Sequence, residues 1–173
     1  HYGLQMNAAG DRLVVGAHQN DGSGADAGHV RAYSYNGSAW VQLGADIDGE
    51  AGSDNFGYVV SINDAGSRIA IGAPYNDGNG NEAGHVRIYD YSSDTDSWSQ
   101  AQSDIDGEAA GDRNGHGVFL SASGDRVAIG AYLNDGTANN AGHVRIFDLK
   151  PAPDTAGPTM PITATDGSNA VAD

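Results

Sequence analysis

The chain has 173 residues, a length that is usual for a single domain. It carries 23 acidic and eight basic side chains, and the formal net charge of −15 argues against nucleic acid and anionic membranes as partners, because phosphate binding needs a basic surface. It contains no cysteine and no run of 18 apolar residues. This excludes a disulfide framework, a cysteine nucleophile and a helical membrane span within the given sequence.

Taken from its start, the sequence repeats itself. The segment AGHVR at residues 27–31 returns at 83–87 and 141–145, with spacings of 56 and 58 residues. Two other landmarks keep the same phase: GA starts at residues 16, 72 and 130, and NDG starts at residues 20, 76 and 134. Such a period indicates a repeat architecture. We divide the chain into repeats at 1–55, 56–113 and a partial one at 114–148, followed by a distinct segment at 149–173.

Within one repeat the pattern is that of β-structure, because short alternating or apolar runs are bounded by Gly, Asn and Asp. In the second repeat we expect strands over 58–63, 68–73, 85–91 and 97–105. The segment 64–67 predicts a tight hairpin in which Gly66 has a positive φ. The predicted fold is all-β, with about three four-stranded antiparallel propeller-type blades that form an incomplete ring.

The third repeat and the segment after it are different. The third repeat has no obvious fourth strand after Phe147 and no counterpart of Trp40 and Trp98. The segment 149–173 contains four prolines and none of the landmarks, which indicates an extended linker. Residues 159–167 resemble the first strand of an immunoglobulin-like repeat of bacterial adhesins. We expect residues 159–165 or a neighbouring chain to supply the missing strand.

The motifs FG at 56–57 and GAP at 72–74 resemble those of the FG-GAP repeat family, the blades of integrin-α-like propellers and of many microbial surface proteins. The resemblance covers about residues 1–148. The first and third repeats depart from it, with GAH at 16–18, GAY at 130–132 and NG at 114–115. The resemblance implies a propeller fold and an extracellular or cell-surface location.

Acidic loops are the candidate metal sites. The motif DIDGE at 46–50 recurs at 104–108, and each copy is followed by another aspartate. The carboxylates are Asp46, Asp48, Glu50, Asp54, Asp104, Asp106, Glu108 and Asp112. Their places at loop positions 1, 3, 5 and 9 favour Ca²⁺, which takes six to eight oxygen ligands. However, the glycine stands at position 4 of the loop, whereas the usual calcium-binding loop has it at position 6. The family resemblance also implies calcium at another place, between the first two strands of a blade. The alternative is that these residues only build turns.

Other polar residues favour structural roles. His29, His85 and His143 occupy one repeated position, which spreads them over three blades and does not gather them into one catalytic group. The arginines recur in the same way, in two columns: Arg12, Arg68 and Arg126, then Arg31, Arg87 and Arg145. The sequence contains no nucleophile elbow, phosphate-binding loop, dinucleotide fingerprint or zinc-helix motif. We therefore expect no enzymatic activity.

The function predicted from these patterns is structural or adhesive, outside the cell. The expected partners are other copies of the chain, joined head to tail in a filament, or a longer parent adhesin; surface glycans and proteins are further candidates. The alternatives are a carbohydrate-binding module that uses Trp40 or Trp98, and the non-catalytic propeller of a larger secreted enzyme. The sequon at Asn36 places a possible N-glycan in a turn before Trp40.

Overall fold

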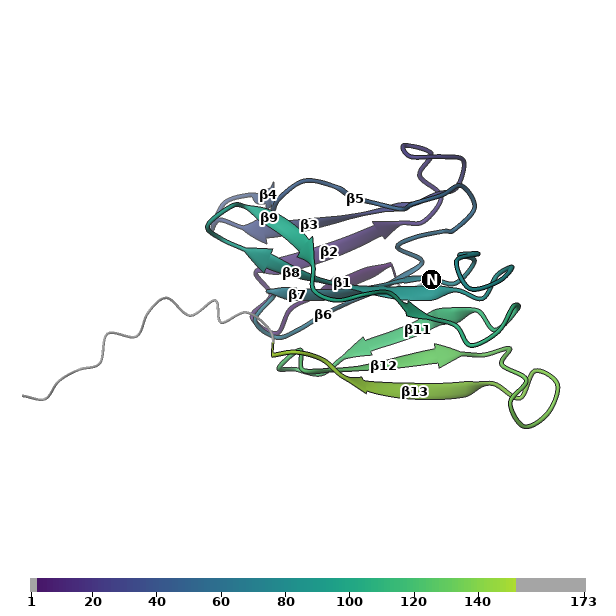
Figure 1. The fold of residues 1–173 in the computed structure, drawn as a ribbon. Helices are drawn as coiled ribbons and strands as arrows, with labels where there is room; N and C mark the ends of the chain where they lie inside the picture. Colours follow the sequence, from purple (N-terminus) through teal and green to yellow (C-terminus); the bar gives the residue numbers. More distant parts are fainter. Residues whose placement is uncertain (1–2, 152–173) are drawn as a thin grey trace, which may run out of the picture.

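A computed structural model describes residues 3–151, which form three antiparallel sheets (Figure 1). Blade 1 consists of β1 (Leu4–Met6), β2 (Arg12–Ala17), β3 (His29–Tyr35), β4 (Trp40–Gln42) and β5 (Ile47–Asp48). Blade 2 consists of β6 (Val59–Ile62), β7 (Arg68–Ala73), β8 (His85–Ser92), β9 (Ser97–Gln100) and β10 (Ile105–Asp106). Blade 3 consists of β11 (Asn114–Leu120), β12 (Arg126–Ala131) and β13 (His143–Asp148). Within the described range, no helix is long and apolar enough to cross a bilayer.

The strands of blade 2 follow the predicted order and nearly the predicted bounds. β7 has the predicted ends, and the preceding hairpin has Gly66 at a φ of 69°. The single fourth strand expected over 97–105 is wrong in one respect: it is divided into β9 and β10, which both pair with β8. The amide of Ala101 still donates to the carbonyl of Ile88. The interruption that follows leaves Asp104 free to reach the side chains of β8.

Blade 3 contains three strands, as its sequence predicted. β12 lies between β11 and β13, and within residues 3–151 the outer edge of β13 carries no further strand. The corresponding edges of blades 1 and 2 are covered by β4 with β5 and by β9 with β10. The strand expected over 159–165 lies outside the described residues. The three blades form part of a ring, not a closed one.

The core lies between the blades, since each sheet buries its faces against the next one (Figure 1). Val14 and Val30 of blade 1 pack against Ile69 and Ile71 of blade 2 in one apolar cluster. The second cluster joins blade 2 to blade 3, where its buried members are Val59, Ala70, Val86, Ile88, Ile105, Val118, Val127, Ile129 and Leu149. Because these apolar side chains leave water only when two blades meet, the hydrophobic effect stabilises the stack as a whole.

Glycines allow the blades to approach closely. A Cβ atom on Gly16 would overlap the carbonyl of Gly57 in the next blade, and one on Gly72 would overlap the carbonyl of Gly115. Gly57 and Gly115 also have positive φ angles of 84° and 88°. The FG and GAP glycines are thus required where the backbones of neighbouring blades come together.

Candidate functional site

A cluster of polar side chains lies at the boundary of blades 1 and 2. His85 and Arg87 stand on β8 and point to the same side of the sheet, because alternate residues of a strand share a face. Asp104 directly precedes β10, which pairs with β8. Glu50 comes from the loop after β5 in the neighbouring blade, so the cluster joins two repeats.

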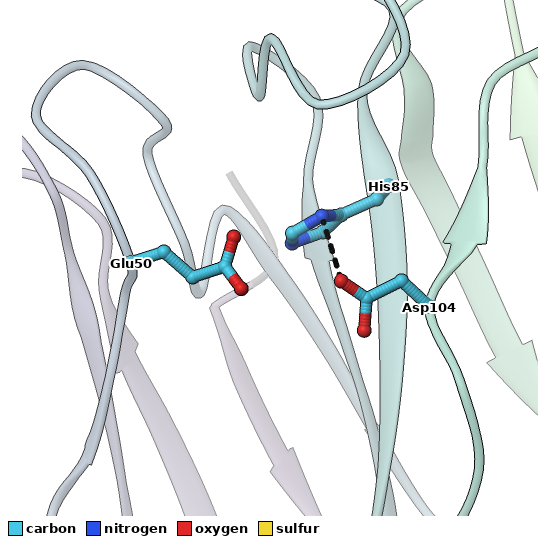
Figure 2. Close-up of side chains that lie close together, drawn as sticks. All are labelled: Glu50, His85 and Asp104. Atoms are coloured by element: carbon cyan, nitrogen blue, oxygen red, sulfur yellow. Dashed lines mark ion pairs between the residues drawn. The ribbon is translucent and has the colours of Figure 1, made fainter.

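The cluster is built around Arg87. Its guanidinium donates two hydrogen bonds to Asp104, from Nε at 3.0 Å and from Nη2 at 2.9 Å, and it also pairs with Glu50. His85 Nδ1 lies 3.6 Å from the Asp104 carboxylate (Figure 2). His85 is buried, and its Nε2 has no hydrogen-bond partner among the described residues. Arg87 thus holds Asp104 of its own blade through a strong bidentate contact and joins blade 2 to blade 1 through Glu50.

The environment shifts the pKa values of these groups. Burial lowers the pKa of His85, and the nearby charge of Asp104 opposes this only in part, so the imidazole is neutral near pH 7. Burial alone would raise the pKa of Asp104, but hydrogen bonds from Arg87 and Gln100 outweigh it and lower the pKa. The carboxylate and guanidinium are therefore charged partners.

Glu50, His85 and Asp104 offer donor atoms within 4.8 Å of one another, and they are the one such group found among residues 3–151 (Figure 2). One imidazole nitrogen and two carboxylate oxygens are atoms that commonly bind divalent cations. However, the guanidinium of Arg87 already pairs with both carboxylates, and its positive charge repels a cation at this place. The arrangement is suited to holding two blades together.

The same arrangement recurs in part at the other repeats. In blade 1, Arg31 donates to Asp46 at 2.8 and 2.7 Å, and His29 Nδ1 lies 3.7 Å from the same carboxylate. Hydrogen bonding from Arg31 lowers the pKa of Asp46 to about 2. Between blades 2 and 3, Glu108 pairs with His143 at 3.4 Å and with Arg145 at 3.8 Å. The repeated histidines and arginines thus make structural contacts, in line with their spread over three blades.

The structure separates the carboxylates of the predicted calcium loops. In the first loop Asp46 turns to Arg31 and Glu50 to Arg87, while Asp48 is exposed, 4.0 Å from His29 Nδ1. Asp54 is buried and accepts a hydrogen bond of 2.8 Å from Asn76. These contacts do not bring the four carboxylates of the loop around one point.

The second loop behaves in the same way. Asp104 binds Arg87, Asp106 is exposed, and Glu108 faces blade 3. Asp112 is buried, where it accepts hydrogen bonds from the side chain of Asn134 and the amide of Ala109. Calcium binding at these loops stays a prediction, and an ion bound there would have to replace the arginine contacts.

The two tryptophans differ in their surroundings. Trp98 is half-buried against the first apolar cluster, and its Nε1 donates to the carbonyl of Leu43 in blade 1 at 2.9 Å. Trp40 is exposed and stacks at a tilt on Tyr35, with ring centroids 5.4 Å apart. Asn36 lies in an exposed turn, where its Oδ1 accepts hydrogen bonds from the amides of Ser38 and Ala39.

One aromatic group was not predicted from the sequence, since its residue types change between repeats: His116 occupies the position of Tyr58. Tyr58 and Tyr132 flank the ring of His116 at 5.0 and 4.4 Å, and Arg113 lies over Tyr75. Next to this group a cavity of about 820 Å³ opens along the inner strands β1, β6 and β11. Its lining is Leu4, Gln5, Tyr58, Val59, Val60, His116, Gly117, Val118 and Phe119. The cavity wall is thus mainly apolar, without carboxylate, lysine or arginine from the described residues.

Antiparallel blades that stack through glycine-lined boundaries define a propeller-type repeat protein. The family model of the FG-GAP repeat matches residues 45–89, which include the FG and GAP motifs and most of the polar contact around Arg87. This match confirms the FG-GAP resemblance of the sequence.

Among solved structures, a protein assigned as a 6-phosphogluconolactonase from Bacteroides uniformis is similar, with 9% sequence identity and a TM-score of 0.49. The match covers 85% of this chain and 35% of that protein, so the chain spans about a third of its length. Comparison with curated proteins gives no significant match.

Proposed function

We propose that this chain is a non-catalytic, propeller-type module of an extracellular or cell-surface protein, with a structural or adhesive role. The observation that supports this most is the use of the recurring charged residues. Arg31, Arg87 and Arg145 face carboxylates of their own blade or of the preceding one, so the side chains that could bind or polarise a substrate instead join β-strands and blades.

The loops at one end of the blades are suited to contact other molecules. The loop between β2 and β3 touches the loop after β5, since the amide of Ser53 donates to the carbonyl of Ala25 at 2.7 Å. Blade 2 repeats this contact between Gly111 and Asn81. Asp21, Asp48, Glu50, Asp77, Asp106, Glu108 and Asp135 are exposed along these loops. A partner with basic groups, or one joined through a divalent cation, would complement this acidic surface.

An adhesion assay tests the adhesive form of the proposal. The chain is coupled to beads at low density through its amino terminus, and bead attachment to cells and to polysaccharide surfaces is measured at increasing salt. We expect attachment that weakens with salt and is reduced when Asp77 and Asp135 are both replaced by Asn. Unaltered attachment of this variant would contradict the role of the acidic loops. Turnover of lactone or ester substrates by the pure chain would contradict the non-catalytic assignment.

A carbohydrate-binding role is the second candidate, and the exposure of Trp40 favours it. An exposed indole next to Tyr35 offers an apolar ring surface on which a sugar can stack. Trp98 is the matched control, because its indole is engaged with Leu43. Loss of polysaccharide binding in a folded Trp40→Ala variant, with binding retained in Trp98→Phe, would support this candidate over the first.

A further inference from the structure

Blade 3 exposes an apolar face on the side away from blade 2. We call this the trailing face, and its residues are Phe119, Ala128, Gly130, Val144 and Ile146. They lie in register across the three strands, since Phe119 is opposite Ala128 and Ala128 is opposite Ile146. The side chains of Phe119 and Ile146 are 73% and 70% exposed. At the same positions in blade 2, Ser61 and Ile88 are 1% exposed because blade 3 covers them.

Blade 1 exposes the complementary side. We call this the leading face, and its residues are Leu4, Met6, Leu13, Val15 and Tyr33. Leu4 is paired with Val15 as Val60 is paired with Ile71 in blade 2. Leu4 is 61% exposed, whereas Val60 is 4% exposed because it packs against blade 1. Within residues 3–151, blade 1 and blade 3 thus each leave one apolar face uncovered. At the two internal boundaries, the faces equivalent to these pack against each other.

We propose that the leading face of a second copy of this chain docks on the trailing face of blade 3, so that copies join head to tail. This inference rests on the structural role proposed above and specifies its interface. The trailing face is suited to bind a blade of this repeat type. It has a glycine, apolar residues and an arginine at the same positions as the faces that are buried at the internal boundaries. A contact between two different faces continues from copy to copy into a filament, or into a ring of two or more copies where the rotation between copies closes.

Gly130 is the first specific indication. It corresponds to Gly16 and Gly72, which must be glycine because the next blade's backbone lies against them. At Gly130 no such neighbour is present among residues 3–151: a Cβ there would meet only Gly117 of its own blade, at 3.9 Å. Gly130 thus offers the close approach that a neighbouring blade uses at both internal boundaries.

Arg126 is the second indication. Arg12 donates to the carbonyl of Gly66 in the next blade at 2.9 Å, and Arg68 donates to that of Gly124 at 2.8 Å. The side chain of Arg68 is 1% exposed, whereas that of Arg126 is 65% exposed and, among residues 3–151, forms its ion pair with Asp148. The equivalent acceptor for Arg126 is the Gly10 carbonyl of the docked copy.

One position differs from the internal boundaries. Gln5 accepts a hydrogen bond from the amide of Ile62 at 2.9 Å, and Ser61 accepts one from Leu120 at 3.0 Å. Phe119 stands at this position in blade 3 and has no acceptor to offer. It adds apolar area instead, so the proposed contact between copies depends more on the hydrophobic effect than the internal ones do.

Sedimentation velocity over a range of concentrations tests the proposal on the full chain. We expect the wild type to form oligomers that grow with concentration. Gly130→Val, which has room in the isolated chain but would clash with a docked backbone, should raise the dissociation constant more than about tenfold, as should Phe119→Asp. The control is Ser99→Val, which also introduces a valine but on the exposed outer strand of blade 2, and this variant should assemble normally. Equal melting temperatures and circular dichroism spectra show that the variants are folded.

A cross-linking experiment tests the head-to-tail orientation of the copies. Because the sequence contains no cysteine, only the introduced cysteines can form disulfides. Met6→Cys and Phe119→Cys are prepared separately and oxidised alone and mixed. We expect a disulfide dimer only in the mixture. A dimer from either variant alone, a monomeric wild type at all concentrations, or normal assembly of Gly130→Val overturns the head-to-tail contact. The bead assay of the proposed function uses isolated chains, so adhesion by Phe119→Asp would leave that function standing even if assembly fails.

Discussion

Gly72 in β7 lies directly against Gly115 at the start of β11, so the backbones of two neighbouring blades touch with no side chain between them. The pair Gly16 and Gly57 makes the same contact one repeat earlier. Any side chain at these places must push two blades apart and open the apolar clusters on either side. The glycines of the FG and GAP motifs are therefore packing residues, whatever else the loops near them bind.

Gly72→Ala is expected to destabilise the chain by about 1–3 kcal/mol, because the added methyl group would overlap the backbone carbonyl of Gly115. A backbone cannot move aside as the end of a flexible side chain can. Gly117→Ala is the matched control, since nothing lies within 4 Å of the added methyl group. Chemical denaturation of both variants at low protein concentration measures the difference. Equal midpoints for the two variants would show that the blades are less closely packed than described.

Replacing Arg68 by Ala is expected to lower the free energy of unfolding by about 3 kcal/mol, because it leaves a partly buried Asp90 and the carbonyl of Gly124 without their partner. Arg126→Ala removes the equivalent residue from an exposed ion pair and should have a much smaller effect. Thermal unfolding at low concentration, where copies do not associate, compares the two. Similar losses would indicate that position 126 is also buried in the folded monomer.

Acid is expected to destabilise the chain in two steps. The pKa of His85 lies below its ordinary value, so the unfolded state binds the proton more readily, and stability present above about pH 6.5 is lost as the pH falls toward the folded pKa. Burial and the charge of Arg113 act on His116 in the same direction. The second step follows between about pH 4 and pH 2, as Asp46 and Asp104 lose their charge.

Melting temperatures between pH 7.5 and 5 check the first of these steps. His85→Gln should make the curve flatter over this range, and the double variant with His116→Gln should make it flatter still. His18→Gln serves as the control, since His18 stands outside the polar contact around Arg87. A curve for His85→Gln parallel to that of the wild type would show that folding does not lower the pKa of His85.

Trp98→Phe is expected to cost about 1 kcal/mol or more of stability, because the carbonyl of Leu43 loses its indole donor and the boundary of blades 1 and 2 loses contact area. Trp40→Phe should have little effect, since Trp40 is exposed. Urea denaturation gives both values. A larger loss for Trp40 would contradict the assignment of Trp98 as the packing residue.

Much of the fold could be predicted from the sequence alone. The recurrence of AGHVR, GA and NDG indicated three repeats, and the alternating runs bounded by Gly, Asn and Asp placed three of the four strands expected in the second repeat within a residue. The alternation over 97–105 did not predict the division of the fourth strand into β9 and β10, where Asp104 meets Arg87 of β8, 17 residues away in sequence.

The candidate sites were less accessible to sequence reasoning. The spacing of Asp46, Asp48 and Glu50 suggested one metal loop, but it did not show that Glu50 faces Arg87 of the next blade while Asp46 faces Arg31 of its own. The aromatic group around His116 was missed because its residue types change between repeats and its rings meet only across blades.

The sequence by itself determined the repeats, the β-class and the positions that each blade uses for packing, because hydrophobic alternation and turn residues act over short distances along the chain. The tertiary structure decided which carboxylate meets which arginine and which apolar faces remain uncovered among residues 3–151, because those contacts form between blades. Ile88 and Ile146 occupy the same position in their repeats, and a neighbouring blade buries the first while the second lies open.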